Sequence, residues 1–198
     1  MVAPDLRRLA YDGAPTEKMY GCDIENRFFD IGYDFYRDRK TFHGMFFKAD
    51  VEQLDQCGEM QKLKGDLDII YCAKILHLFN REEQKQRIKD LLRYIRPQVG
   101  SMFVVSQNGY MGSPTFDRPP SMGRPGGKIW MADADGWTDL WREVEQDTGS
   151  KWETKCRLFD LRTIGMHKDD GSDYKRLTGY CLQATMRLID VGHLAGAS

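Results

Sequence analysis

The chain has 198 residues, of which 41% are hydrophobic and 30% charged, and its formal net charge is −1. This length suits one domain with a sizeable core, and a balanced, dispersed charge gives no basis for nucleic acid or an anionic membrane as a partner. No apolar run reaches the roughly 20 residues of a membrane helix, and the N-terminus lacks the apolar block of a signal peptide. Five cysteines without a Cys-x-x-Cys pair indicate reduced thiols and no zinc. We therefore expect a cytoplasmic protein without a metal.

Strand-like and helix-like patterns alternate along the chain, which predicts an α/β fold with a doubly wound, mostly parallel sheet. Four strands are expected to lie parallel in one sheet, and two later ones to pair antiparallel at a mixed edge. In chain order, the expected elements are helix 4–13, strand 19–22, helix 25–37, strands 45–49 and 67–73, helix 81–95, strand 101–106, helix 135–149, and strands 152–161 and 179–189.

Two segments interrupt this alternation. Residues 108–127 are rich in Gly, Pro, Ser and Met, and such a long stretch is either a functional loop or lid, or disordered. Residues 190–198 are expected to be a frayed tail. We expect residues 1–198 to form a single domain.

Two of the expected strands end in an acidic residue, Asp23 and Asp50. Ligands of open α/β sheets bind beyond the carboxyl ends of strands, and a carboxylate accepts hydrogen bonds from both ribose hydroxyls. Asp23 is therefore a candidate ribose ligand, with the N-cap of the next helix as the alternative. For Asp50 the alternative is a turn or a cap.

Several short motifs follow one another along the chain. They are Asp5-Leu-Arg-Arg-Leu9, Asp12-Gly-Ala-Pro15, Tyr20-Gly-Cys-Asp-Ile-Glu25, Phe29-Asp-Ile-Gly-Tyr-Asp34, Arg37-Asp-Arg39, Phe47-Lys-Ala-Asp50 and Leu76-His-Leu-Phe79. In this order they resemble class I S-adenosylmethionine-dependent methyltransferases of fungal meroterpenoid and related secondary-metabolite clusters. The resemblance runs from Asp5 to about Ile189.

The resemblance implies S-adenosylmethionine as cofactor and methyl transfer to a carboxylate or hydroxyl oxygen of an apolar small molecule. A homodimer is the other partner that we consider. The cofactor-binding residues that the resemblance implies are Cys22, Asp23 and Ile24 at the ribose, Ala49, Asp50 and Val51 at the adenine, and Cys72 near the point of methyl transfer.

The start of the chain departs from this family, which opens with a strand and a glycine-rich turn around the methionine carboxylate. Ala3 and Pro4 stand where glycine and a polar residue are expected, and Pro4 has no N–H to donate. We therefore expect an N-terminally truncated sheet that retains the nucleoside contacts. Two alternatives remain open: a catalytically silent interaction module, and a methyltransferase-like isomerase or cyclase.

Three further observations leave alternatives open. His77 follows the expected strand 67–73 and is either a general base or a packing residue. Trp130, Trp137 and Trp141 either wall a substrate pocket or fill the core. Without a basic neighbour that the sequence identifies, the thiol of Cys72 is expected to behave as a small core side chain.

Overall fold

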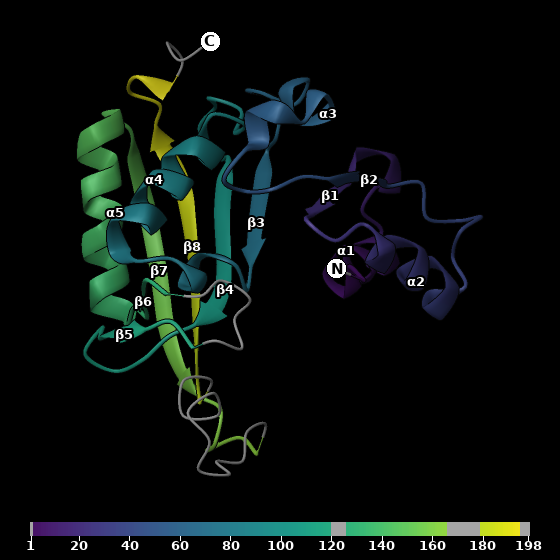
Figure 1. Ribbon diagram of the computed structural model, residues 1–198. Coiled ribbons are helices and arrows are strands. Elements are labelled where there is room, and N and C mark those ends of the chain that lie inside the picture. The colour runs from purple at the N-terminus through teal and green to yellow at the C-terminus, as the bar shows by residue number, and fades with distance from the viewer. Residues whose placement is uncertain (1, 120–125, 166–178, 195–198) are drawn as a thin grey trace. The chain divides into compact units, whose positions relative to one another are not determined.

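The computed structural model describes residues 2–119, 126–165 and 179–194. The chain divides into two compact units, Met1–Leu63 and Lys64–Ser198. Each unit contains its own main sheet, and a third, short sheet lies in the second unit (Figure 1). The prediction of a single domain over residues 1–198 stays a prediction.

The first unit is a small α/β layer with a two-stranded parallel sheet. Strands β1 and β2 pair in register from Tyr20 with Met45 to Asp23 with Lys48. Its elements are α1 (Pro4–Tyr11), η1 (Thr16–Lys18), β1 (Tyr20–Asp23), α2 (Arg27–Tyr36), β2 (Met45–Lys48), η2 (Leu54–Gln56) and α3 (Gly58–Gln61).

The guanidinium of Arg7 is at the centre of the first unit's packing. It lies 5.3, 4.7 and 5.1 Å from the ring centroids of Tyr33, Tyr36 and Phe42, and Asp38 accepts hydrogen bonds from it at 2.6 and 3.2 Å. A guanidinium has a flat apolar surface that stacks on aromatic rings and an edge of N–H donors. Arg7 thereby joins α1 to α2 and to the loop that follows α2.

The second unit is organised around a mixed four-stranded sheet with the order β3-β4-β8-β7. β3 and β4 are parallel, whereas β8 runs antiparallel to both β4 and β7. Its elements are β3 (Ile69–Ala73), η3 (Leu76–Leu78), α4 (Arg81–Leu92), β4 (Met102–Asn108), β5 (Thr115–Asp117), β6 (Lys128–Trp130), α5 (Ala134–Thr148), β7 (Lys151–Asp160) and β8 (Tyr180–Asp190).

The two long helices of this unit begin at side-chain caps. At α4, Asn80 and Glu83 form a capping box in which each side chain accepts a hydrogen bond from the other residue's backbone N–H. At α5, the Asp133 carboxylate accepts from Gly136 N–H at 2.8 Å. The helix ends at Gly149, whose φ of +66° is a left-handed conformation that glycine adopts without strain.

Helices α4 and α5 cover one face of the four-stranded sheet (Figure 1). Side chains on that face alternate with exposed ones along the strands, as the period of two requires. The opposite face carries exposed side chains in the described residues, such as Ile69 and Tyr71 of β3. The largest fully buried side chains of this unit are Trp137, Trp141, Tyr94, Phe103, Leu76, Ile88, Leu92, Ile129, Met131, Leu140, Leu182 and Met186.

The structure confirms the α/β class and the antiparallel edge, and it corrects one prediction about the sheet. The four strands expected to lie parallel in one sheet form two separate parallel pairs, β1 with β2 and β3 with β4. No described strand pairs with the outer edge of β1 or of β3, so the two pairs share no ladder of hydrogen bonds. The apolar pattern of a strand predicts the strand itself but not which strand it hydrogen-bonds to, so the sequence did not distinguish one sheet from two separate pairs.

The segment 108–127 is also more ordered than its composition predicts. Strand β5 lies within it and pairs antiparallel with β6, from Thr115 with Trp130 to Asp117 with Lys128. Residues 120–125 of this segment and residues 195–198 of the expected tail lie outside the described residues.

Candidate functional site

The two acidic strand ends of the first unit lie at neighbouring positions. Asp23 ends β1 and Asp50 follows β2 by two residues. The two strands are hydrogen-bonded and parallel, and Ala49 N–H donates to the Asp23 carbonyl at 3.1 Å, which extends the ladder past the end of β2. Both carboxylates therefore lie at the carboxyl edge of one sheet, as the sequence predicted.

The Asp23 side chain shapes the turn after β1. Its Oδ1 accepts a hydrogen bond from Glu25 N–H at 2.9 Å. The N-cap of α2 is Asn26, so the alternative role of Asp23 as a helix cap is wrong. An aspartate that binds a backbone N–H two residues ahead fixes a turn.

Asp50 forms the same kind of turn after β2. Its Oδ1 accepts a hydrogen bond from Glu52 N–H at 2.9 Å. The alternative role of Asp50 as a turn residue is therefore correct for this oxygen. In the part of the chain that the structure describes, no acceptor receives the N–H of Val51. A carboxylate oxygen and a backbone donor thus remain side by side after β2.

The residues beside these carboxylates differ in their exposure. Ala49 is buried, whereas Ile24 is 60% exposed. Burial, with smaller contributions from Asp23 and Cys57, raises the pKa of the Cys22 thiol to about 11. Cys22 is therefore a neutral thiol at physiological pH and a poor nucleophile.

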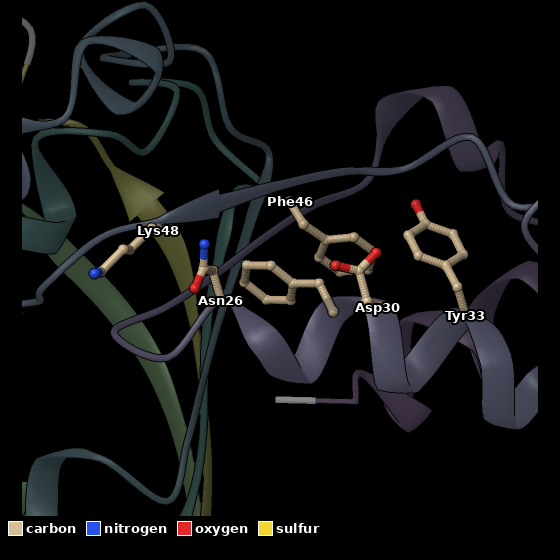
Figure 2. Close-up of a pocket in the computed structure, with 6 residues that line it drawn as sticks. Asn26, Asp30, Tyr33, Phe46 and Lys48 are labelled. Carbon is tan, nitrogen blue, oxygen red and sulfur yellow. The ribbon is translucent and has the colours of Figure 1, made fainter.

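A hollow of about 330 Å³ opens in the first unit between α2 and β2. Figure 2 shows Asn26 and Lys48 at one end, Tyr33 at the other, and Phe46 and Asp30 between them. Neither Asp23 nor Asp50 lines this hollow. Because the strand-end groups carry the chemistry that a nucleoside needs, we place the candidate site at the strand ends and not in the hollow.

Cys72 and His77 belong to the second unit. Cys72 is buried on the helix-covered face of β3 and is in register with Val105. His77 is 4% exposed within η3, and its Nδ1 has no hydrogen-bond partner among the described residues. Burial, and secondly the charge of Lys74, lowers the pKa of His77 to about 4. The imidazole is therefore neutral at pH 7 and enclosed.

The tryptophans fill the core of the second unit. Trp137 and Trp141 are at most 1% exposed and stack with ring centroids 6.4 Å apart, and Trp152 meets Trp141 edge to face at 5.4 Å. Trp130 is also buried. Core packing, one of the two alternatives for Trp130, Trp137 and Trp141, is the correct one.

The structure contains a polar cluster at the carboxyl ends of β3 and β4 that the sequence analysis did not predict. The Lys74 ammonium donates to Asn108 Oδ1 at 2.9 Å and lies 3.9 Å from Cys181 Sγ. The Ser106 hydroxyl is 3.7 Å from the same sulfur. The only sequence signal for Lys74 was its position directly after the strand β3, because its partners are 34 and 107 residues away along the chain.

No group of three His, Cys, Asp or Glu side chains in the described residues is arranged to hold a metal ion. Of the described helices, none is long and apolar enough to cross a membrane.

The chain is similar in sequence to fungal methyltransferases. It is 32% identical over 180 residues to the O-methyltransferase phiE of Fungal sp. (strain ATCC 74256), covering 90% of this chain and 58% of phiE. It is 34% identical to the O-methyltransferase atr3 of Stereocaulon alpinum, over 79% of this chain and 44% of atr3. The Asnovolin E/Chermesin D methyltransferase nvfJ of Aspergillus novofumigatus is 32% identical, over 81% and 58% of the two chains. The chain thus spans about half the length of these relatives.

Solved structures share the fold. The [4+2]-cyclase SpnF superposes with a TM-score of 0.61 at 17% identity, over 94% of this chain and 71% of SpnF. The magnesium protoporphyrin IX methyltransferase ChlM from Synechocystis, solved with bound SAH, gives a TM-score of 0.57 at 15% identity, over 94% and 69% of the two chains. No protein-family model matches the chain.

The fold is that of the Rossmann-like class to which these solved methyltransferase and cyclase structures belong. Within that class, the chain is a relative of fungal secondary-metabolite O-methyltransferases, and the resemblance read from its motifs is confirmed.

Proposed function

We propose that this protein binds S-adenosylmethionine and serves O-methylation of an apolar secondary metabolite. The observation that carries the proposal is the pair of carboxylates at the carboxyl ends of two hydrogen-bonded parallel strands, Asp23 and Asp50. Similarity to fungal O-methyltransferases over most of the chain supports the reaction class.

The groups at the strand ends fit the nucleoside part of this cofactor. A ribose offers two hydroxyl donors, which a carboxylate such as that of Asp23 accepts. An adenine edge offers an amine donor and a ring-nitrogen acceptor, which match the Asp50 carboxylate and the Val51 N–H. We assign these residues to the nucleoside, with Cys22, Ile24 and Ala49 as their neighbours along the chain.

When bound, S-adenosylmethionine supplies an electrophilic methyl group, so the protein's own part is to align the reactants and to exclude water. The histidine expected as a candidate base is neutral but buried, and its pKa is lowered to about 4. A weak, enclosed base favours an acceptor oxygen that is already ionised, because such an oxygen needs no deprotonation. We therefore favour a carboxylate over a hydroxyl as the acceptor.

Two other functions have the same fold. SpnF, whose structure superposes on this chain, is named a [4+2]-cyclase, and a fold alone does not define a reaction. A cyclase or a silent interaction module would retain the sheet without requiring methyl transfer.

Calorimetry with S-adenosylhomocysteine tests the nucleoside assignment. We expect Asp23→Ala and Asp50→Ala each to weaken binding by roughly 1.5–3 kcal/mol, the usual loss for a hydrogen bond to a charged group. Asp34→Ala is the matched control, because Asp34 is an exposed aspartate of α2 in the same unit, 78% exposed at its side chain.

An unchanged affinity in both strand-end variants would refute the assignment. Absence of any binding by the unmodified protein would favour the silent module. Binding without release of a methylated product from a panel of acidic and hydroxylated terpenoids would favour the cyclase.

A further inference from the structure

Lys74 has a backbone conformation that its residue type disfavours. Its φ is +55°, in the left-handed region, where a side chain other than that of glycine, asparagine or aspartate costs about 1–2 kcal/mol. The backbone is held there because Lys74 N–H donates to the Ser106 carbonyl at 2.7 Å, which continues the β3–β4 ladder. The ammonium lies across the end of β4, against Asn108. An unfavourable backbone angle at the end of a strand is a reason to look for function.

Among the described residues, the two partners of this ammonium are neutral. Lys74 Nζ donates to the Asn108 carboxamide and approaches the Cys181 thiol, and no carboxylate of the described residues forms an ion pair with it. Elsewhere Lys62, Lys85 and Lys128 face carboxylates at 2.8, 3.1 and 2.8 Å. An ammonium has three donors, so with one full hydrogen bond and one weak contact to sulfur, Lys74 retains both charge and a donor for an anion.

Apolar side chains lie near this charge on the same face of the sheet. Asn108, Cys181 and Phe159 form one row across β4, β8 and β7, and the Phe159 ring is 36% exposed at its end. Along β3, Tyr71 and Ile69 are 42% and 56% exposed on the face that the helices leave open. A hydrogen-bonded cation on a face that also carries exposed aromatic and aliphatic groups is complementary to an apolar molecule with one acidic group.

We propose that Lys74, positioned by Asn108, binds the carboxylate of an apolar acid at the carboxyl end of β3 and β4. The inference rests on the proposed function in that it names the substrate class, a carboxylic acid. Esterification removes the negative charge, so Lys74 distinguishes the acid from its methyl ester, and the ester should dissociate readily.

The test measures binding and not turnover. The probes are 1-pyrenebutyric acid and its methyl ester, titrated by fluorescence in the presence of S-adenosylhomocysteine. We expect the unmodified protein to bind the acid at least about tenfold more tightly than the ester, because one charge-assisted hydrogen bond is worth roughly 1.5–3 kcal/mol and tenfold in affinity is 1.4 kcal/mol. Lys74→Met should remove that preference by weakening the acid alone, and Lys74→Arg should restore part of it.

The matched control is Lys155→Met, which removes an exposed lysine of β7 in the same unit, one that is paired with Glu153. It should leave the preference for the acid intact. Equal affinities of acid and ester in the unmodified protein, no binding of either, or an acid affinity that Lys74→Met leaves unchanged would each overturn the inference. Titration of S-adenosylhomocysteine alone reports on the nucleoside assignment, so failure of the proposed function is recognised separately from failure of the Lys74 site.

Discussion

Arg7 and Asp38 are joined by two hydrogen bonds of 2.6 and 3.2 Å across 31 residues of sequence, and their side chains are only 7% and 17% exposed. A buried ion pair contributes little net stability compared with a well-packed apolar pair, but removal of one partner leaves an uncompensated charge. The first unit therefore depends strongly on both members being present.

We predict that Arg7→Met lowers the free energy of unfolding of the first unit by about 3–5 kcal/mol, because Asp38 is left buried and unpaired. Hydrogen–deuterium exchange of peptides from residues 19–48 is the measurement. Arg8→Met is the control, since Arg8 is 74% exposed and forms its ion pair with the half-exposed Asp12, a contact worth at most about 1 kcal/mol. Equal exchange in the two variants would contradict the central role of Arg7.

His77 should make the second unit less stable in mild acid. Its pKa is lowered from 6.5 to about 4 in the folded state, so the unfolded state binds more protons between these values. The contribution is fully present above pH 6.5 and is lost as the pH falls toward 4. At pH 5 the loss is about 2 kcal/mol, since one pKa unit corresponds to 1.36 kcal/mol.

Urea denaturation at pH 7 and pH 5 measures this effect. His77→Leu should show a smaller loss of stability between the two pH values than the unmodified protein, whereas the exposed His43→Gln should show the same loss. An identical pH dependence in His77→Leu would mean that the pKa of His77 is the same in the folded and unfolded states.

Asp133 should be a strong local stabiliser of the second unit. Besides capping α5 through Gly136 N–H, its carboxylate accepts from the Ser113 hydroxyl at 2.7 Å and from Gly112 N–H at 2.8 Å. We expect Asp133→Ala to lower the free energy of unfolding by about 1–2 kcal/mol or more, because it removes the helix cap and the hydrogen bonds to Ser113 and Gly112. The exposed Asp135→Ala, two residues into the same helix, is the control, and an equal effect of both variants would count against the role of the cap.

Lys74 provides a prediction about strain that is independent of any ligand. Lys74→Gly removes the left-handed penalty while adding flexibility to the unfolded chain, so we expect stability to be unchanged or higher by up to about 1 kcal/mol. Lys74→Val should lose about 1–2 kcal/mol, because a β-branched residue tolerates this φ poorly. Arg37→Gly, at φ +54° after α2, is the control position and should behave like Lys74→Gly. A clear loss of stability in Lys74→Gly, measured by thermal unfolding, would mean that the side chain serves the fold.

Local sequence signals predicted the elements well because their causes are local. The helices expected at 81–95 and 135–149 are examples, because the structure shows that Asn80 caps α4 and Gly149 ends α5, each directly beside its helix. The same holds for Asp23 and Asp50, whose turns are fixed by N–H groups two residues ahead.

Contacts between residues far apart in the sequence were harder to predict from the sequence. The separation of β1–β2 from β3–β4 depends on which strands share hydrogen bonds, and periodicity does not encode this. The Lys74 cluster joins residues from three strands, and its left-handed backbone has no glycine to signal it. The ordered part of 108–127 depends on β6, which lies beyond the segment itself.

All four tryptophans belong to the second unit, and the first 63 residues contain none. Indole emission during melting will therefore follow the unfolding of the second unit, whereas far-ultraviolet dichroism will follow the helices of both. If the units lose structure at different temperatures, the two optical transitions will not coincide, and a single two-state fit to either signal will not describe the protein. Any thermal-shift screen for ligands that uses intrinsic fluorescence would then not report on the unit that contains Asp23 and Asp50.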